Sequence, residues 1–106
     1  MNLKKNMYYA IYDITDNSTR SSLVYILKNA GFIRIQKSVF CGNISSQQKK
    51  DVIELVKNIM EDKDDSFYLI LTCRQCFGKI ETIGKGFDKE YVSDEKYSEV
   101  LWYRNA

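Results

Sequence analysis

The stretch Met7-Tyr8-Tyr9-Ala10-Ile11-Tyr12-Asp13-Ile14 is apolar and aromatic, and its one charge, Asp13, lies near its end. Aromatic and β-branched side chains are typical of strands, so the stretch predicts a strand that ends near Asp13. Asp16, Asn17 and Ser18 follow directly and are able to stop the strand and cap a helix. Asp13 is therefore not needed for capping, and its carboxylate is the first candidate for chemistry.

Two amphipathic helices are predicted from apolar residues at helical spacing. The first ends at Gly31 and carries an apolar stripe of Leu23, Ile26, Leu27 and Ala30. The second begins with a capping box in which Gln48 follows Ser45 at the required distance. Its buried face consists of Val52, Leu55, Val56, Ile59 and Met60.

The remaining segments predict strands and turns. Residues 32–42 alternate in period two and predict one long strand, or two short strands that meet near Gln36-Lys37. The charged residues 61–65 predict a solvated turn, 66–72 an apolar central strand, and 79–83 a short edge strand. The resulting order β-α-β-β-α-β is typical of the ferredoxin-like α+β fold, with one antiparallel sheet and both helices on one face.

The second face of this sheet is predicted to be apolar as well. If Ala10 and Tyr12 face the helices, then Tyr9, Ile11 and Asp13 face the other side. Such a face needs cover, most economically from a second copy, so we expect a homodimer through the sheet. Two copies of Asp13 would then form a hard-oxygen site suited to Mg²⁺ or Mn²⁺, an ion that can assist phosphodiester cleavage.

Composition limits the size and chemistry of the protein. A chain of 106 residues, 44% hydrophobic and without proline, suits one compact domain. The formal charge of +2 means that nucleic-acid binding would need local basic patches. The lack of histidine removes the commonest general base. Because the chain has neither a long apolar run nor a leader with a cleavage site, we expect a cytoplasmic protein that does not bind a membrane.

The three cysteines, Cys41, Cys73 and Cys76, do not suggest a disulfide framework. The Cys73-x-x-Cys76 spacing is that of a zinc half-site or of a redox pair. A zinc site would lack a fourth ligand unless a carboxylate or another subunit supplied it. The favoured interpretation is therefore reduced cysteines at a strand end that pack as small hydrophobic residues.

Three motifs occur together in a characteristic order: Tyr12-Asp13-Ile14 at the end of the first strand, Arg20 on the first helix, and Arg34-Ile35-Gln36-Lys37-Ser38-Val39-Phe40. In this order and spacing the chain closely resembles the small CRISPR-associated family called Cas-two. Members of that family begin with a Y-D-I/V strand and carry a Q-x-S-V-F segment. The resemblance covers about residues 7–84, which include a fourth strand near Tyr68 to Thr72.

The resemblance implies a ferredoxin-like homodimer whose tail often adds a strand to the partner's sheet. It implies a metal-dependent endonuclease acting on RNA or double-stranded DNA, and a scaffold that holds duplex DNA with the Cas-one integrase during spacer acquisition. On this basis residues 1–6 form an extension, residues 7–84 the domain, and residues 85–106 a tail that docks on a subunit surface. A toxin ribonuclease and a dimer that binds a small regulatory ligand stay open as alternatives.

The resemblance also implies a set of site residues. Asp13 would be the ligand of Mg²⁺ or Mn²⁺ and, with Tyr12 and Ser38, would form the catalytic group. Nucleic acid would be bound by Arg20, Arg34, Lys37 and Phe40. Arg34 and Lys37 carry the charge needed to neutralise phosphates. Two plainer interpretations stay open, in which Arg20 is a solvated helix residue and Phe40 packs in the core or in the dimer.

Overall fold

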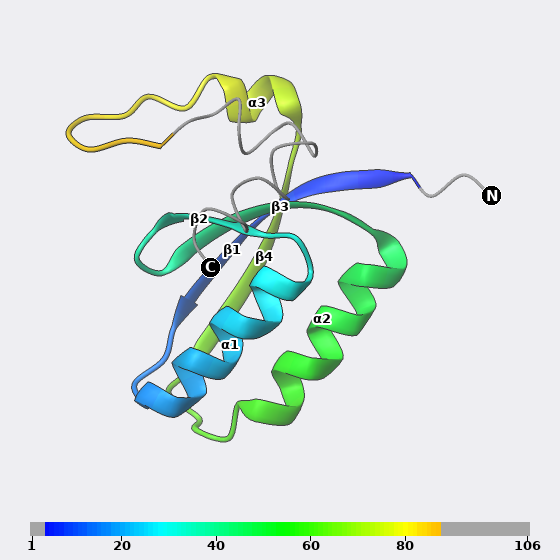
Figure 1. Cartoon of the computed structure of the whole chain (residues 1–106), viewed down its shortest axis with the longest axis vertical. Helices are drawn as coiled ribbons and strands as arrows, with labels where there is room; N and C mark the ends of the chain where they lie inside the picture. Colours follow the sequence, from blue (N-terminus) through cyan, green and yellow to red (C-terminus); the bar gives the residue numbers. More distant parts are fainter. Residues whose placement is uncertain (1–3, 88–106) are drawn as a thin grey trace.

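The computed structural model describes residues 4–87, which contain one four-stranded sheet, two long helices and a short one (Figure 1). The elements, in chain order, are β1 (Lys5–Asp13), α1 (Asn17–Asn29), β2 (Ile33–Gln36), β3 (Val39–Ser45), α2 (Ser46–Ile59), β4 (Ser66–Thr72) and α3 (Arg74–Gly78). The tail predicted to dock on a subunit and to add a strand lies mostly outside the described residues.

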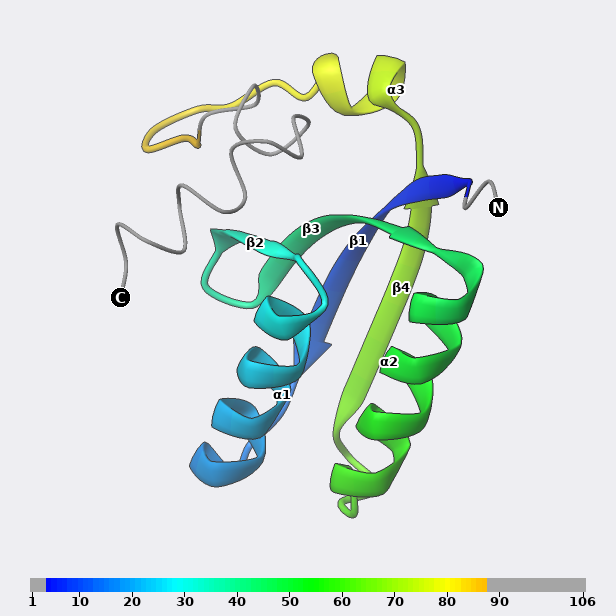
Figure 2. The same ribbon diagram turned by 45° about the vertical axis from the view of Figure 1, so that its right-hand side comes forward.

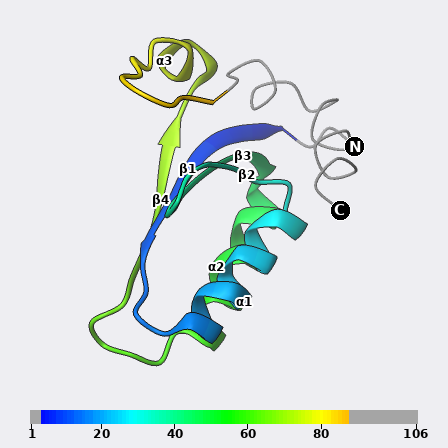
Figure 3. The same ribbon diagram turned by 60° about the vertical axis from the view of Figure 1, so that its left-hand side comes forward.

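The sheet has the strand order β2-β3-β1-β4, and every neighbouring pair is antiparallel. Both long helices lie on the same face of it, as Figures 2 and 3 show from two directions. The predicted α+β class with one antiparallel sheet is thereby confirmed, and the arrangement is consistent with the ferredoxin-like fold. Of the two possibilities for residues 32–42, the pair of short strands is correct.

The main core lies between the sheet and the two long helices. Alternate residues of β1, namely Tyr8, Ala10 and Tyr12, point into it, as the period-two pattern predicts. The helices contribute most of the apolar stripes predicted from the sequence, and their buried side chains are Leu23, Leu27, Val52 and Val56. The prediction that Leu55 is buried is wrong, because its side chain is 48% exposed on α2 and does not join the core.

The predicted helix ends are also confirmed. The Asp16 side chain caps α1 by accepting a hydrogen bond from the Thr19 N–H at 2.8 Å. Ser45 and Gln48 form the full capping box at the start of α2. Gly31 follows α1 with φ of +92°, a backbone conformation that favours glycine.

The chain after β4 differs from the prediction. Residues 79–83 do not form an edge strand; the short helix α3 precedes them instead. The physical reason is Phe77, which α3 places against Met7 and Cys41 on the sheet face away from the long helices, where it is fully buried. Ile80 and Phe87 pack against the same cluster, so this segment covers one end of that face instead of extending the sheet edge.

Two further features, the start of β1 and the position of β4 in the sheet, differ from the prediction. β1 begins at Lys5, two residues before the apolar stretch, because Lys5 and Asn6 pair with the end of β3. β4 is an edge strand of the described sheet, not a central one. The strand is rich in apolar residues, and two of its side chains, Tyr68 and Ile70, are 58% and 44% exposed. No helix within residues 4–87 has the length and apolar character to cross a bilayer.

Candidate functional site

A hollow of about 650 Å³ lies where the end of β1, the first turns of α1 and the β2–β3 turn meet. Residues from β1, α1, β2 and the β2–β3 turn line it, and six of the seven predicted site residues are among them. These six are Tyr12, Asp13, Arg20, Arg34, Lys37 and Ser38. Residues that lie up to 26 positions apart in sequence are therefore brought together, as the set of motifs predicts.

Asp13 is the last residue of β1, and its side chain is exposed. Its backbone pairs with Ser66 of β4, which fixes the position from which the carboxylate projects. The capping of α1 falls to Asp16, as expected. The hydrogen bond from the Thr19 N–H, with others from the Ser18 and Thr19 hydroxyls, holds the pKa of Asp16 below its usual value. Asp13 therefore remains available for a ligand.

Arg20 holds the loop that follows Asp13. One terminal nitrogen of its guanidinium donates to the carbonyl oxygens of Ile14, at 2.8 Å, and Thr15, at 3.1 Å. The other terminal nitrogen donates to the Asn17 side chain. These bonds direct the guanidinium towards the protein backbone and give Arg20 a positioning role beside the predicted phosphate contact.

Asp65 is a site-supporting residue that the sequence did not reveal. Its carboxylate accepts a hydrogen bond from the Thr15 N–H at 3.1 Å, across 50 positions of sequence. In the sequence Asp65 belongs to a charged run for which a solvated turn is the favoured prediction. Its role depends on the pairing of β1 with β4, which no local pattern encodes.

Tyr12 is buried on the helix side of the sheet, and it fixes the β2–β3 turn. Its hydroxyl donates to the Lys37 carbonyl at 3.2 Å, and its backbone N–H donates to the Ser38 carbonyl at 3.2 Å. Ser38 is half-buried and lines the same hollow as Asp13. Tyr12 thus sets the position of Lys37 and Ser38 relative to the end of β1.

Phe40 is the exception among the predicted residues. Its side chain has 0% exposure, which agrees with the interpretation that Phe40 packs in the core. The Arg34 guanidinium carbon lies 5.0 Å from the centre of the Phe40 ring. This cation–π contact helps to hold the exposed Arg34 side chain in position. Phe40 therefore contributes to the hollow indirectly, by positioning Arg34.

The charges of the hollow suit an anionic ligand with a metal ion. Arg20, Arg34 and Lys37 bring three positive charges beside the single carboxylate of Asp13. Residues 4–87 contain no group of three or more acidic, cysteine or histidine side chains placed to hold a metal. Because Mg²⁺ is commonly held by one or two carboxylates together with waters and substrate phosphates, the exposed Asp13 fits such an ion as one of its ligands.

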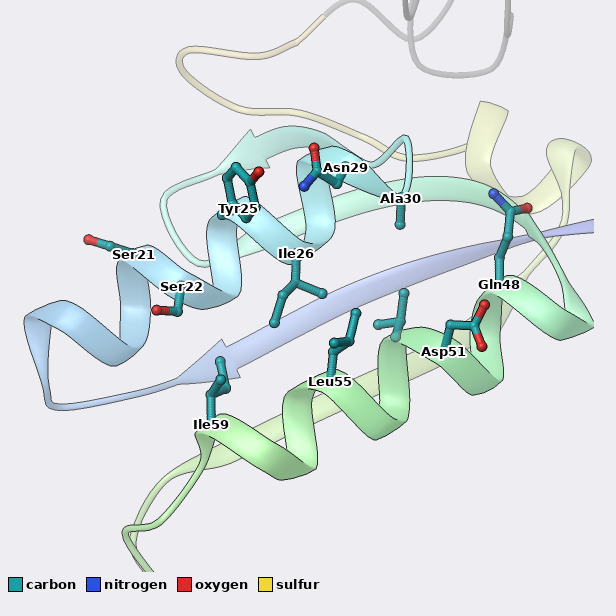
Figure 4. A pocket seen from close by; sticks show the side chains of 11 residues that line it. Ser21, Ser22, Tyr25, Ile26, Asn29, Ala30, Gln48, Asp51, Leu55 and Ile59 are labelled. Carbon is teal, nitrogen blue, oxygen red and sulfur yellow. The ribbon is translucent and has the colours of Figure 1, made fainter.

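A second hollow, of about 730 Å³, lies between α1 and α2 (Figure 4). Its floor is apolar, with Ile26, Leu55 and Ile59 pointing into it from the two helices. Neither lysine nor arginine lines it. A phosphate-bearing ligand therefore finds charge complementarity at the Asp13 hollow and not here.

The cysteines divide into two kinds. Cys41 is buried in the sheet, and burial raises the pKa of its thiol to about 12. Cys73 and Cys76 are exposed, so the expectation that they pack as small hydrophobic residues is wrong. The physical reason is that Phe77 is the buried residue of α3, whereas Cys73, its N-cap, and Cys76 stay exposed.

A sequence profile described as "CRISPR associated protein Cas2" matches residues 6–80. The chain belongs to the Cas2 family. The "CRISPR-associated endoribonuclease Cas2" of Korarchaeum cryptofilum is 34% identical over 76 residues, which are 72% of this chain and 82% of that protein. The "CRISPR-associated endoribonuclease Cas2 2" of Pyrobaculum aerophilum is 33% identical over 79 residues, covering 74% of this chain and 87% of that protein.

Among solved structures, the Cas2 chain is similar to the hypothetical protein TT1823 from Thermus thermophilus. The TM-score is 0.69 at 26% identity, and the match covers 79% of this chain and 96% of that one. Membership of the Cas2 family confirms the resemblance read from the three motifs. All three motifs, and therefore the whole Asp13 hollow, fall inside the matched residues 6–80.

Proposed function

We propose that this Cas2 protein is a metal-dependent endonuclease that cleaves single-stranded RNA or duplex DNA at the Asp13 hollow. The observation that carries the proposal is the convergence of one exposed carboxylate with three cationic side chains and a serine in a single hollow. The relatives named as endoribonucleases support RNA as the first substrate to test.

Each side chain of the hollow has a distinct task in this proposal. Asp13 would hold Mg²⁺ or Mn²⁺, which when bound supplies Lewis-acid polarisation of a phosphoryl oxygen. Arg34 and Lys37, both exposed, bind phosphate oxygens and stabilise the charge that develops on them. Ser38 offers a hydroxyl beside the scissile phosphate, while Tyr12 and Arg20 keep the turn and the loop in place.

The active form in this proposal is a homodimer that joins through the open face of the sheet. Ile11, Tyr68 and Ile70 lie on that face, because they alternate with the residues that point into the helix-side core. Figure 3 views the sheet from the side, with the long helices on one side only. A second copy would cover this apolar surface and bring a second Asp13 to the ion.

Cleavage of a fluorescent single-stranded RNA in Mg²⁺ or Mn²⁺ tests the enzymatic part. Asp13→Asn keeps the size of the side chain and removes its charge, so we expect loss of cleavage with an unchanged fold and oligomeric state. The matched control is Asp64→Asn, which changes an exposed carboxylate in the α2–β4 loop and is expected to cleave normally. Equal cleavage by repurified Asp13→Asn and Asp64→Asn would overturn the proposal.

A second role is proposed from the same cations. Arg34 and Lys37 are exposed, and phosphate contacts of this kind hold a duplex without reading its sequence. We infer that the dimer also holds duplex DNA for the Cas-one integrase during spacer acquisition. Acquisition in cells should survive Asp13→Asn and fail when Arg34 and Lys37 are changed to glutamate. The opposite pattern would show that acquisition depends on cleavage by this chain.

A further inference from the structure

The segment Cys73-Arg74-Gln75-Cys76 lies at the far end of the sheet from Asp13. It joins the end of β4 to α3, whereas Asp13 pairs with the first residue of β4. Figure 2 shows α3 beyond the end of β4, away from the body of α1 and α2. The two thiols are therefore outside the proposed nuclease site and need a separate explanation.

The two cysteines are coupled by a direct contact. The Cys76 backbone N–H donates to the Cys73 sulfur at 3.3 Å, so one helical turn holds both residues together. Both side chains are exposed. The backbone around this contact is ordered by Phe77, which is fully buried one residue further on and anchors the turn to the sheet.

The electrostatics of the pair make the two sulfurs unequal. The hydrogen bonds from Cys76, helped by the positive charge of Lys79, hold the pKa of the Cys73 thiol below its ordinary value. The pKa of Cys76 is raised, mainly because its thiol is hydrogen-bonded to Cys73. Cys73 thus has the larger thiolate fraction, which is the form that attacks disulfides and alkylating agents.

Metal binding explains this pair less well. Within residues 4–87 there is no third acidic, cysteine or histidine side chain placed to complete a site with Cys73 and Cys76. Two thiolates supply only half of the tetrahedral set that a structural zinc ion takes. Thiol–disulfide chemistry, in contrast, needs only an exposed attacking thiol and a second thiol within reach.

We propose that Cys73 and Cys76 form a thiol–disulfide exchange site for low-molecular-weight disulfides such as glutathione disulfide. The Cys73 thiolate attacks one sulfur of the disulfide, forms a mixed disulfide and releases one thiolate. The Cys76 thiol gives its proton to solvent and attacks the Cys73 sulfur, releasing the second thiolate. The chain loses two hydrogen atoms in total, and one disulfide molecule becomes two thiols.

Cys41 serves as an internal control for this chemistry. It is fully buried in β3, and the pKa of its thiol is about 12, so it should remain reduced while the fold persists. The reduced full-length chain is incubated with glutathione disulfide, alkylated in denaturant and digested for mass spectrometry. We expect an internal disulfide in the peptide that contains residues 73–76, with Cys41 fully alkylated.

Single substitutions separate the two sulfurs. Cys76→Ser should accumulate the mixed disulfide at Cys73, and Cys73→Ser should react several times more slowly at Cys76. The wild-type chain tests the same ranking of the cysteines without any substitution. The alkylation rate of each cysteine is measured in the native state and compared with its rate in urea, and we expect Cys73 to react faster than Cys76 in the native state. Equal native rates at all three cysteines would overturn the proposal. Full protection of both thiols by stoichiometric Zn²⁺ alone would also overturn it, in favour of a metal site.

Discussion

Tyr12 and Asp13 are neighbours in sequence, but their side chains leave opposite faces of β1. Tyr12 is enclosed by the core and Asp13 is exposed. The sequence predicted that Asp13 is not needed to cap α1, because three residues able to cap a helix, Asp16 to Ser18, follow within five positions. The support from Asp65 was not readable, because its contact with Thr15 spans 50 positions and depends on the pairing of β1 with β4. The bonds from Arg20 to Ile14 and Thr15 are local, but no sequence pattern shows which carbonyl oxygens an arginine will contact.

Tyr12→Phe tests the support of the β2–β3 turn. The change removes the hydroxyl that donates to the Lys37 carbonyl, so we expect a loss of about 1 kcal/mol in the free energy of unfolding. Urea denaturation measures it, and Tyr25→Phe, which changes an exposed hydroxyl on α1, should leave stability unchanged. Equal stabilities of the two variants would contradict a role for the Tyr12 hydroxyl.

Lys37→Gln tests the proposed phosphate contact. If Lys37 neutralises one phosphate, the substitution should weaken nucleic-acid binding for all sequences alike and lower the slope of log affinity against log salt by about 1. Binding titrations at several salt concentrations measure that slope. Lys63→Gln in the exposed α2–β4 loop should leave the slope unaltered. A Lys37→Gln slope equal to that of the wild type would place Lys37 outside the interface.

At the scale of elements, sequence patterns predicted well wherever a local signal existed. The capping box at Ser45 and the helical stripe of α1 are local, and both were correctly placed. α3 was missed because it has only five residues and no periodic apolar pattern. It forms because Phe77 gains burial against Met7 and Cys41, a tertiary effect. The edge position of β4 was missed for a related reason. An apolar sequence indicates that a strand is covered, but it does not show whether neighbouring strands or a partner subunit cover it.

Gly42→Ala tests the packing of β3 on the segment before β2. A Cβ atom at Gly42 would lie 2.6 Å from Cγ of the buried Phe32 ring, so the ring or the strand must shift. We expect a destabilisation of about 1–3 kcal/mol in thermal or urea unfolding. Gly78→Ala is the matched control, because a Cβ atom there meets nothing within 4 Å and the backbone is helical. Equal effects of the two substitutions would contradict this packing.

The proposed dimer depends on the open face of the sheet. Tyr68 and Ile70 are 58% and 44% exposed in the single chain, on a face whose other end is covered by α3 and Phe87. The need for a partner was inferred from alternation along β1 alone. The extent of the uncovered surface could not be inferred, because no sequence pattern indicates that α3 covers part of the face.

Ile70→Lys tests whether this face joins two copies. A charge within the proposed contact would have to be buried without a partner, so we expect the variant to sediment as a monomer and the wild type as a dimer. The control is Leu55→Lys, since Leu55 is 48% exposed on the opposite layer, on α2. A dimeric Ile70→Lys chain, or a monomeric wild type at micromolar concentration, would reject this interface.

Mixed dimers show whether two copies of the Asp13 hollow form one nuclease site. Wild-type and Asp13→Asn chains are co-refolded over a series of ratios, and the rate of Mg²⁺-dependent RNA cleavage is measured for each mixture. If both carboxylates are required, the rate follows the square of the wild-type fraction, and an equal mixture retains about a quarter of the activity. A rate proportional to the wild-type fraction, or undiminished cleavage by pure Asp13→Asn, would exclude a site shared by the two copies.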